Sequence, residues 1–312
     1  MRVFVTGGAG FIASNLCERL LQEGHHVTAF DNLLLGRLQF IAPLRSDAKF
    51  RFIKGDLLNP PALKRAITGH QAVFHMACNS DIQKGTLATD TDLKLGTLAT
   101  YNVLEAMRLA RIRQIVFAST SAVYGESTAL PTPEDYGPLL PISLYGASKL
   151  AAEALISSFG HCYNVKAWIF RFANIVGKNG THGALVDFIR KLRRNPRRLE
   201  ILGDGRQAKP YLHVADCVDG MMHGWEKSRA PLNVFNLTPD DRTNVRDIAR
   251  IIVRRMGLPS VRFAYTGGSR GWPGDVARVL LDGRRMKKLG WKPPLRSDQA
   301  VKKAVDDLLG QL

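Results

Sequence analysis

The sequence has no long hydrophobic run and little cysteine. A transmembrane helix needs about 18 or more consecutive apolar residues, and the chain contains no run of that length. The four cysteines (Cys17, Cys78, Cys162 and Cys217) include no Cys-x-x-Cys pair and no common zinc spacing. We therefore expect buried free thiols, with no disulfide framework, metal site or membrane span. The apolar stretch before the first glycines is too short for a signal peptide, which predicts a cytoplasmic protein.

Acidic residues are also scarce. There are 27 aspartates and glutamates against 44 lysines and arginines, which gives a net charge of +17. Such an excess can steer a diphosphate ligand inward or attract nucleic acid. The densest basic runs lie within 190–198, 250–255 and 284–288, and no aromatic residues interleave with the arginines. This pattern is typical of solvated helix faces, so we expect no nucleic-acid partner.

The first half of the chain alternates short apolar runs with helical patterns. Strands are expected at Arg2–Thr6, Val27–Phe30, Phe50–Ile53, Ala72–Met76, Ile115–Ser119 and Val165–Arg171. Helices are expected between them, including Leu98–Ala110, Tyr145–Phe159 and a helix that Asn59 caps before Pro60. This alternation predicts an α/β fold built on a Rossmann-like, doubly wound parallel sheet.

The second half is less regular and predicts a smaller C-terminal α/β substrate lobe. Its expected elements are strands at Leu199–Leu202, Val234–Leu237 and Val261–Ala264, and helices at Ala184–Arg194, Val214–Glu226, Val245–Met256 and Ser297–Leu309. We place the first domain at residues 1–174 and the lobe at 175–312, with segments near 213–237 returning to the first domain. Residues 125–141, rich in proline and glycine, are expected to form a surface loop.

A glycine-rich turn follows the first strand and opens the first helix. Gly7 permits the tight turn, and Gly10 lets the backbone approach a pyrophosphate held at the helix N-terminus. Asp31 ends the second strand 24 residues after Gly7. A carboxylate there can accept hydrogen bonds from the adenosine ribose and would repel a 2′-phosphate, which favours NAD over NADP. An ordinary βα turn with a capping aspartate is the alternative interpretation.

Tyr145 and Lys149 lie four residues apart in a predicted helix, and therefore on one face. A neighbouring ammonium is expected to lower the pKa of the phenol and make it a general base. Upstream, Ser119, Thr120 and Ser121 lie at the carboxyl end of a predicted strand, where α/β sheets bind ligands. A hydroxyl there could contact the substrate oxygen that Tyr145 deprotonates. A Tyr-x-x-x-Lys pair alone occurs by chance in many helices, but the ordered set of motifs is harder to obtain by accident.

In this order the motifs resemble those of the extended short-chain dehydrogenases/reductases, and within them the sugar-nucleotide epimerases, especially those called UDP-glucose 4-epimerases. The resemblance covers essentially the whole chain. Its matching segments are Thr6–Ala13, Gly55–Leu57, Phe74–Ala77, Ser119–Gly125, Tyr145–Lys149, Arg171–Gly177, Leu202–Asp216 and Arg270–Asp275.

The resemblance assigns roles to residues at these positions. It implies a catalytic set of Tyr145, Lys149 and Thr120, the last of which lies 25 residues before the tyrosine. Together with the glycine turn it implies NAD contacts from Gly7, Gly10, Phe11, Ile12, Asp31, Asn32, Asp56, Leu57, Ala77, Tyr145 and Lys149. It implies substrate contacts from Ser121, Asn174, Lys209, Tyr211, Arg270 and Asp275, with segments 203–211 and 270–275 closing over the nucleotide.

Several positions depart from the family pattern. The third glycine of the turn is Ala13, and an asparagine common ahead of the central helix is replaced near Leu95-Gly96. Lys209 stands where the family has an arginine, so a point charge replaces a planar fork. The spacing between Arg270 and the following Gly-Asp is also longer than usual.

The resemblance implies a homodimeric, NAD-dependent epimerase of a nucleotide sugar, acting at C4 of a UDP-hexose or UDP-hexuronic acid through a 4-keto intermediate. A dehydratase, decarboxylase or reductase of the same family is one alternative; a non-catalytic nucleic-acid-binding relative is another. Dehydratases and decarboxylases usually carry an acid just after the active-site threonine, where this chain has Ser121 and Ala122. Leu150, Ala154 and Ile156 could supply apolar surface for a dimer, although core packing explains them equally well.

Overall fold

The computed structural model describes residues 1–272 and 274–311, the side chains of Gln83 and Lys84 excepted. Within these residues the central sheet has seven strands: β1 (Arg2–Thr6), β2 (His26–Asp31), β3 (Phe50–Lys54), β4 (Ala72–His75), β5 (Gln114–Thr120), β6 (Lys166–Phe172) and β11 (Leu232–Leu237). They lie in the order β11–β6–β5–β4–β1–β2–β3, and every neighbouring pair is parallel. The predicted doubly wound parallel sheet is confirmed.

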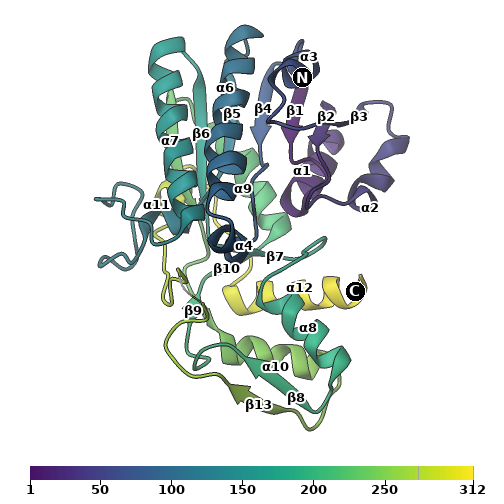
Figure 1. Ribbon diagram of the computed structural model, residues 1–312, viewed down its shortest axis with the longest axis vertical. Coiled ribbons are helices and arrows are strands. Elements are labelled where there is room, and N and C mark those ends of the chain that lie inside the picture. Colours follow the sequence, from purple (N-terminus) through teal and green to yellow (C-terminus); the bar gives the residue numbers. More distant parts are fainter. Residues whose placement is uncertain (273, 312) are drawn as a thin grey trace.

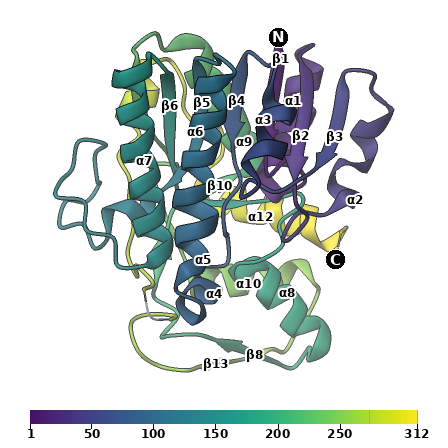
Figure 2. The ribbon, with the colours of Figure 1, turned by 45° about the horizontal axis from the view of Figure 1, so that its top comes forward.

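Helices cover both faces of this sheet, so its central strands are buried on both sides. The long flanking helices are α1 (Phe11–Gln22), α3 (Pro60–Ile67), α6 (Ala99–Leu109), α7 (Leu144–Tyr163) and α9 (Val214–Lys227). One core cluster joins α1 and α9 through Leu20 and Met222, and a second joins α3, α6 and α7 through Leu63, Leu104 and Ile156. Figure 2 shows α3, α6 and α7 over the same face of the strands.

Shorter helical segments connect these elements. They are α2 (Leu38–Ile41), η1 (Ala42–Ser46), α4 (Ile82–Leu87), α5 (Asp90–Asp92), η2 (Leu93–Leu98), η3 (Ser121–Tyr124) and α11 (Arg284–Lys288). The η2 segment is a π-helical turn that precedes α6, so the helix expected from Leu98 begins one residue later, at Ala99. The cap expected before α3 is present, since Asn59 Oδ1 accepts a hydrogen bond from the Ala62 amide at 3.2 Å.

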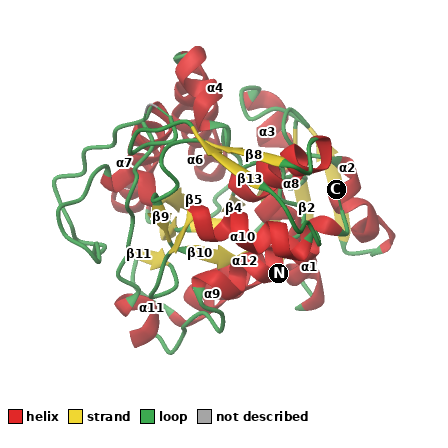
Figure 3. Cartoon of the chain, turned by 90° about the horizontal axis from the view of Figure 1, so that it is seen from below, coloured by secondary structure: helices red, strands yellow, loops and turns green. Residues whose placement is uncertain are grey.

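A second layer of structure lies below the sheet in Figure 1. It contains α8 (Ala184–Arg194), α10 (Val245–Arg255), α12 (Ser297–Leu309), β8 (Arg198–Ile201) and β13 (Arg262–Tyr265). The helices share a core that includes Ile189, Ile252 and Val305, and Figure 3 shows α8, α10 and α12 grouped with the β8–β13 pair. The arginines of α8 and α10 that follow the apolar stripe, such as Arg194 and Arg254, are exposed.

Three short connections tie this lobe to the sheet. The strand β7 (Asn174–Val176) pairs in parallel with β10 (Tyr211–His213), and β9 (Ala208–Lys209) pairs antiparallel with β12 (Thr243–Asn244). After β10 the chain runs through α9 and then adds β11 to the edge of the central sheet. Segments from both halves of the chain therefore meet where β6 ends.

Two expectations need correction. The loop 125–141 is fastened rather than wholly superficial, because Thr132 and Glu134 are buried and the Thr132 amide donates to the Leu280 carbonyl at 2.8 Å. All four cysteines are free, but Cys162 is exposed near the end of α7 and Cys78 is half-buried after β4, while Cys17 and Cys217 are buried. The residue type alone does not determine whether the folded chain buries a cysteine. Among the described helices, none combines the length and apolarity needed to cross a bilayer.

Candidate active site

The carboxyl ends of the sheet strands open into one cleft of about 760 Å³, bounded on its other side by the C-terminal lobe. Small-molecule sites commonly have volumes of about 300–1,000 Å³. The strand order reverses between β1 and β4, and ligands of open α/β sheets bind at such a point. Gly7 after β1, Ala77 after β4 and Thr120 at the end of β5 all line this cleft.

The glycine turn leaves room for a ligand at the start of α1. Gly7 has φ +66°, and a Cβ there would lie 2.8 Å from the Ala77 Cα, so both the backbone and the close approach require glycine. Gly10 is the N-cap of α1 and provides no side-chain acceptor, and no acidic residue follows in the first turn. The amides of Phe11 and Ile12 are therefore placed to bind an anionic group from the ligand.

The Asp31 carboxylate supports this turn from the end of β2. Its Oδ2 accepts a hydrogen bond from the Ala9 amide at 3.0 Å, and its Oδ1 accepts one from the Leu33 amide at 2.7 Å. Burial raises the pKa of Asp31, while these two hydrogen bonds oppose the rise. Because each oxygen can accept more than one bond, the carboxylate can still accept from ribose hydroxyls in the cleft that it lines.

The remaining residues expected at the adenosine end lie beside Asp31. Asn32 Nδ2 lies 3.4 Å from Asp56 Oδ2, and Asp56 Oδ1 accepts from the Leu58 amide at 2.8 Å. Leu57 supplies an apolar wall next to them. Three features together fit a dinucleotide such as NAD. They are the amides of Phe11 and Ile12 at the glycine turn, the Asp31 carboxylate, and this pocket of polar and apolar side chains.

Tyr145 and Lys149 lie on the first turns of α7, which Ser143 caps by accepting from the Gly146 amide at 3.1 Å. Lys149 Nζ is 5.9 Å from the centroid of the Tyr145 ring and donates to the Ala118 carbonyl at 2.6 Å. The Lys149 side chain is only 2% exposed. A Cβ at Gly146 would lie 2.7 Å from the Ala122 carbonyl oxygen, so glycine after the tyrosine lets α7 approach the end of β5.

The Tyr145 hydroxyl interacts with the Thr120 hydroxyl and the Cys78 thiol. Burial in the cleft wall raises the pKa of Tyr145 well above its ordinary value, and the hydrogen bond with Thr120 opposes this rise. This corrects the expectation of a lowered pKa: in the protein chain itself the pKa of Tyr145 is raised, because desolvation of the phenolate is the largest effect. The Lys149 ammonium is directed at the Ala118 carbonyl.

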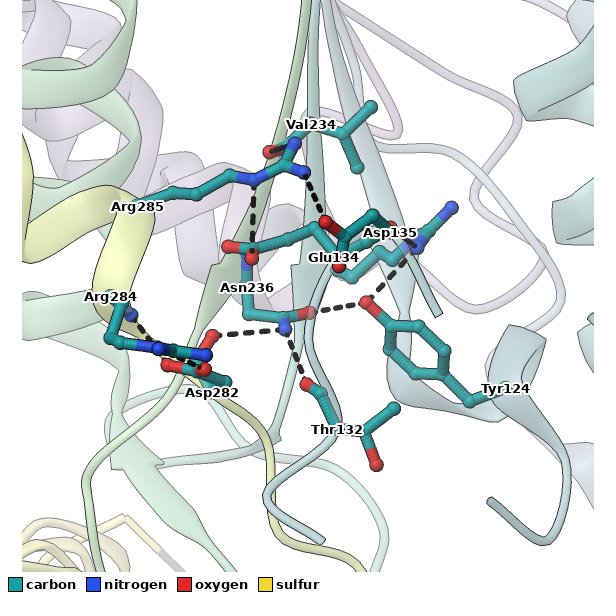
Figure 4. A network of polar contacts seen from close by, with 10 residues as sticks. Tyr124, Thr132, Glu134, Asp135, Val234, Asn236, Asp282, Arg284 and Arg285 are labelled. Carbon is teal, nitrogen blue, oxygen red and sulfur yellow. Dashed lines mark hydrogen bonds and ion pairs between the residues drawn. The ribbon is translucent and has the colours of Figure 1, made fainter. Parts of the chain in front are cut away.

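A buried polar network supports the floor of the site. The Arg171 guanidinium donates to Glu153 on α7 and, at 3.0 Å, to the Tyr124 hydroxyl. The Tyr124 hydroxyl in turn donates to Asn236 Oδ1 at 2.8 Å. The backbone N–H of Asn236 donates to Glu134 Oε1 at 3.0 Å (Figure 4). The network joins the loop 125–141, β6, α7 and β11, which fixes the carboxyl ends of the strands.

The expected substrate residues Ser121, Asn174, Lys209, Tyr211 and Asp275 also line the cleft. Lys209 Nζ lies 2.5 Å from Asp275 Oδ1, where the side chains are 18% and 3% exposed.

Arg270 is the exception. Its guanidinium lies on the surface, 2.7 Å from Glu126 Oε1, and it does not line the cleft. Within the segment expected to close over the nucleotide, Pro273 lies outside the described residues.

The sequence did not indicate three of the cleft residues as individual contacts. Trp272 Nε1 and Gln207 Oε1 are buried without hydrogen-bond partners among the described residues, and both side chains line the cleft near Lys209. The Lys209 ammonium lies 5.4 Å from the centroid of the Trp272 ring system. Cys78 is the third, and its position directly after Ala77 at a strand end was the available signal.

The fold and this cleft define a short-chain dehydrogenase/reductase with an NAD site. The chain belongs to the NAD dependent epimerase/dehydratase family, whose model matches residues 3–237. It is similar to a UDP-glucose 4-epimerase of Mycolicibacterium smegmatis, with 30% identity over 98% of each chain. A crystal structure of a UDP-galactose 4-epimerase has a TM-score of 0.89 and 36% identity over 100% of both chains. A Thermus thermophilus UDP-glucose 4-epimerase solved with NAD has a TM-score of 0.88 and 28% identity, again over 100% of both chains.

Proposed function

We propose that this protein is an NAD-dependent epimerase that inverts C4 of a UDP-hexose or a UDP-hexuronic acid through a 4-keto intermediate. The observation that carries the proposal is the convergence of Tyr145, Thr120 and Lys149 on the wall of the cleft that the glycine turn also lines. The names of similar proteins support it, since they are UDP-glucose and UDP-galactose 4-epimerases.

In the proposed mechanism, Tyr145 removes the proton from the sugar C4 hydroxyl, and Thr120 hydrogen-bonds the same oxygen. Lys149 contributes positive charge beside the phenolate and holds the nicotinamide ribose. NAD, when bound, would supply the hydride acceptor and donor for C4 of the sugar. Tyr145 then returns its proton to the C4 oxygen. Burial raises the pKa of Tyr145, so the ability of Tyr145 to act as a base depends on the positive charges of Lys149 and of bound NAD.

The residues after Thr120 favour epimerisation over elimination. Dehydration needs a further acid or base beside the sugar. Ser121 and Ala122 provide no carboxylate, and the nearby Glu126 is engaged with Arg270 at the surface. We assign Ser121, Asn174, Tyr211 and the Lys209–Asp275 pair to the nucleotide-sugar end of the cleft.

A substrate panel tests the proposal. The purified protein with NAD would be mixed separately with UDP-glucose, UDP-glucuronate and their N-acetyl counterparts, and the products followed by proton NMR. We expect one of these sugars to equilibrate with its C4 epimer while NAD shows no net consumption. No conversion of any of them, together with retention of RNA at physiological salt, would favour the non-catalytic alternative. Release of water or carbon dioxide would favour a dehydratase or decarboxylase.

We also propose that the enzyme forms a homodimer through α6 and α7. Leu98, Tyr101 and Leu109 are 44%, 44% and 46% exposed on α6 or just before it. Of the α7 residues considered for this face, Ile156 is core and only Ala154 is exposed. Sedimentation of the parent and of a Tyr101→Glu variant would test the interface. The free thiols suit a reducing compartment, and we propose the cytoplasm.

A further inference from the structure

Asp92 is a buried carboxylate that the proposed mechanism does not use. It is 2% exposed and lies at the end of α5, where the π-helical turn η2 begins. Its Oδ1 accepts a hydrogen bond from Asn79 Nδ2 at 3.0 Å, whereas its Oδ2 has no hydrogen-bond partner among the described residues. A Cβ at Gly85 would lie 2.1 Å from this Oδ2, so glycine there makes room for the carboxylate. A buried carboxylate with so few donors calls for a nearby positive charge.

Burial raises the pKa of Asp92, whereas the hydrogen bond from Asn79 and the charge of Lys149 oppose this rise. Among the described residues, Lys149 is thus the positive charge that stabilises the Asp92 carboxylate. Among the described residues, the ammonium donates one hydrogen bond, to the Ala118 carbonyl, and it lies 4.7 Å from the centroid of the Phe117 ring. An ammonium that is buried with so little compensation also needs an opposite charge.

The other titratable groups around Lys149 do not supply that charge. Glu153, one turn later on α7, is a buried carboxylate, but both of its oxygens accept hydrogen bonds from the Arg171 guanidinium. Burial lowers the pKa of His75 on β4 to about 3, so this imidazole is neutral at neutral pH. Burial raises the pKa of Tyr145 on α7, which keeps the phenol protonated in the chain itself. The Cys78 thiol, after β4, faces the Tyr145 hydroxyl. Asp92, from α5, is the carboxylate that acts electrostatically on both Lys149 and Tyr145.

The backbone holds this carboxylate at a fixed place relative to α7. Four residues after Asp92, Gly96 packs against Ser148, the neighbour of Lys149, and a Cβ at Gly96 would lie 2.5 Å from Ser148 Oγ. The Thr100 hydroxyl donates to the Gly96 carbonyl at 2.6 Å and lies 3.0 Å from His75 Nε2. The π-helical turn is therefore clamped between α7 and β4.

We propose that Asp92 is a positioning residue: it is the fixed counter-charge that keeps the Lys149 ammonium beside Tyr145. The proposal rests on the proposed function for the catalytic meaning of Tyr145. The electrostatic relationship between Asp92 and Lys149 can be tested separately from turnover.

The first test titrates Tyr145 in the NAD-bound protein by its phenolate absorbance, with Tyr145→Phe subtracted to isolate the signal. Asp92→Asn preserves the side-chain shape and removes the charge. We expect the midpoint to fall by about 1 pH unit, since a like charge no longer opposes the phenolate. The acid limb of the pH–rate profile should move by the same amount. The matched control is Asp90→Asn, which removes an exposed carboxylate paired with Lys94 and should leave the midpoint unchanged. Equal midpoints in the parent and both variants would overturn the proposal.

The second test is a double-mutant cycle on stability, which needs no catalysis. Asp92→Asn should lower the melting temperature of the parent but raise that of a Lys149→Met variant, where the carboxylate has lost its counter-charge. Additive effects of the two substitutions would overturn the proposal. If Asp92→Asn alone does not fold, Lys149→Met and the double variant still decide the sign. Full activity of Tyr145→Phe would remove the proposed function and leave this cycle valid.

Discussion

The Arg171 guanidinium donates two hydrogen bonds to the Glu153 carboxylate, from Nε to Oε1 at 3.0 Å and from Nη2 to Oε2 at 2.7 Å. Glu153 lies one turn after Lys149 on α7, and Arg171 lies on β6. The Ser119 hydroxyl, next to Thr120, donates to the same carboxylate at 2.5 Å. One buried ion pair thus ties α7, which carries Tyr145 and Lys149, to β6 and, through Ser119, to the end of β5, where Thr120 lies.

Breaking this pair should be costly. Glu153→Gln leaves the Arg171 charge buried without a full partner, and we expect a loss of about 3–5 kcal/mol in the free energy of unfolding. Urea unfolding at neutral pH measures the change. Glu105→Gln is the matched control, since its ion pair with Arg108 is more exposed, and it should cost less than about 1 kcal/mol. Equal losses in the two variants would contradict the structural role of Glu153.

Tyr145→Phe should abolish the epimerase activity and spare NAD binding. The phenyl ring retains the packing in the cleft wall, but the group that exchanges the proton is gone, so turnover should fall by about 100-fold or more. Steady-state rates and NAD titration separate the two effects. Tyr101→Phe, at an exposed position on α6, serves as the control. A Tyr145→Phe enzyme with full activity would exclude this residue as the base.

Lys209 and Arg270 should respond differently to the loss of their charge. Lys209 lies in the cleft and pairs with Asp275, so Lys209→Met leaves a carboxylate where the diphosphate is expected and should raise the KM by about 10-fold or more. Arg270 faces Glu126 outside the cleft, and Arg270→Met should change the KM little. Initial rates at saturating NAD test both variants. The reverse ranking would show that the segment 270–275 rearranges around the substrate.

His75 should make the protein less stable in mild acid. Burial, aided by the Lys149 charge, lowers its pKa to about 3 in the folded state. Below an unfolded pKa of about 6.5 the unfolded chain binds a proton that the native state does not, so stability falls as the pH drops toward about 3.

We expect His75 to account for about 2 kcal/mol of lost stability between pH 7 and pH 5. His75→Gln should therefore lose less stability over this interval than the parent, as measured by urea unfolding at both pH values. His161→Gln, at an exposed position, is the control. An unchanged pH dependence in His75→Gln would contradict the assignment.

Much of the scaffold could be read from short windows of sequence. The strands β1 to β6 follow apolar runs bounded by turn residues, and the Asn59 cap, the glycine turn and the Tyr145–Lys149 spacing each depend on residues within one or two turns. Such signals are local because backbone periodicity and capping are set by near neighbours. They placed nearly every expected cleft residue on the right element.

Relationships between distant segments could not be read in this way. Nothing near Asp92 in the sequence indicates that the charge of Lys149 acts on it, and nothing near Lys209 indicates that its partner is Asp275 rather than a ligand. Short strands such as β7 and β10 exist because they pair with each other across the chain. The pKa of Tyr145 depends on how much water the folded wall excludes, and Arg270 lies outside the cleft because Glu126 is near it. These features are set by packing and burial, which arise only once the whole chain has folded.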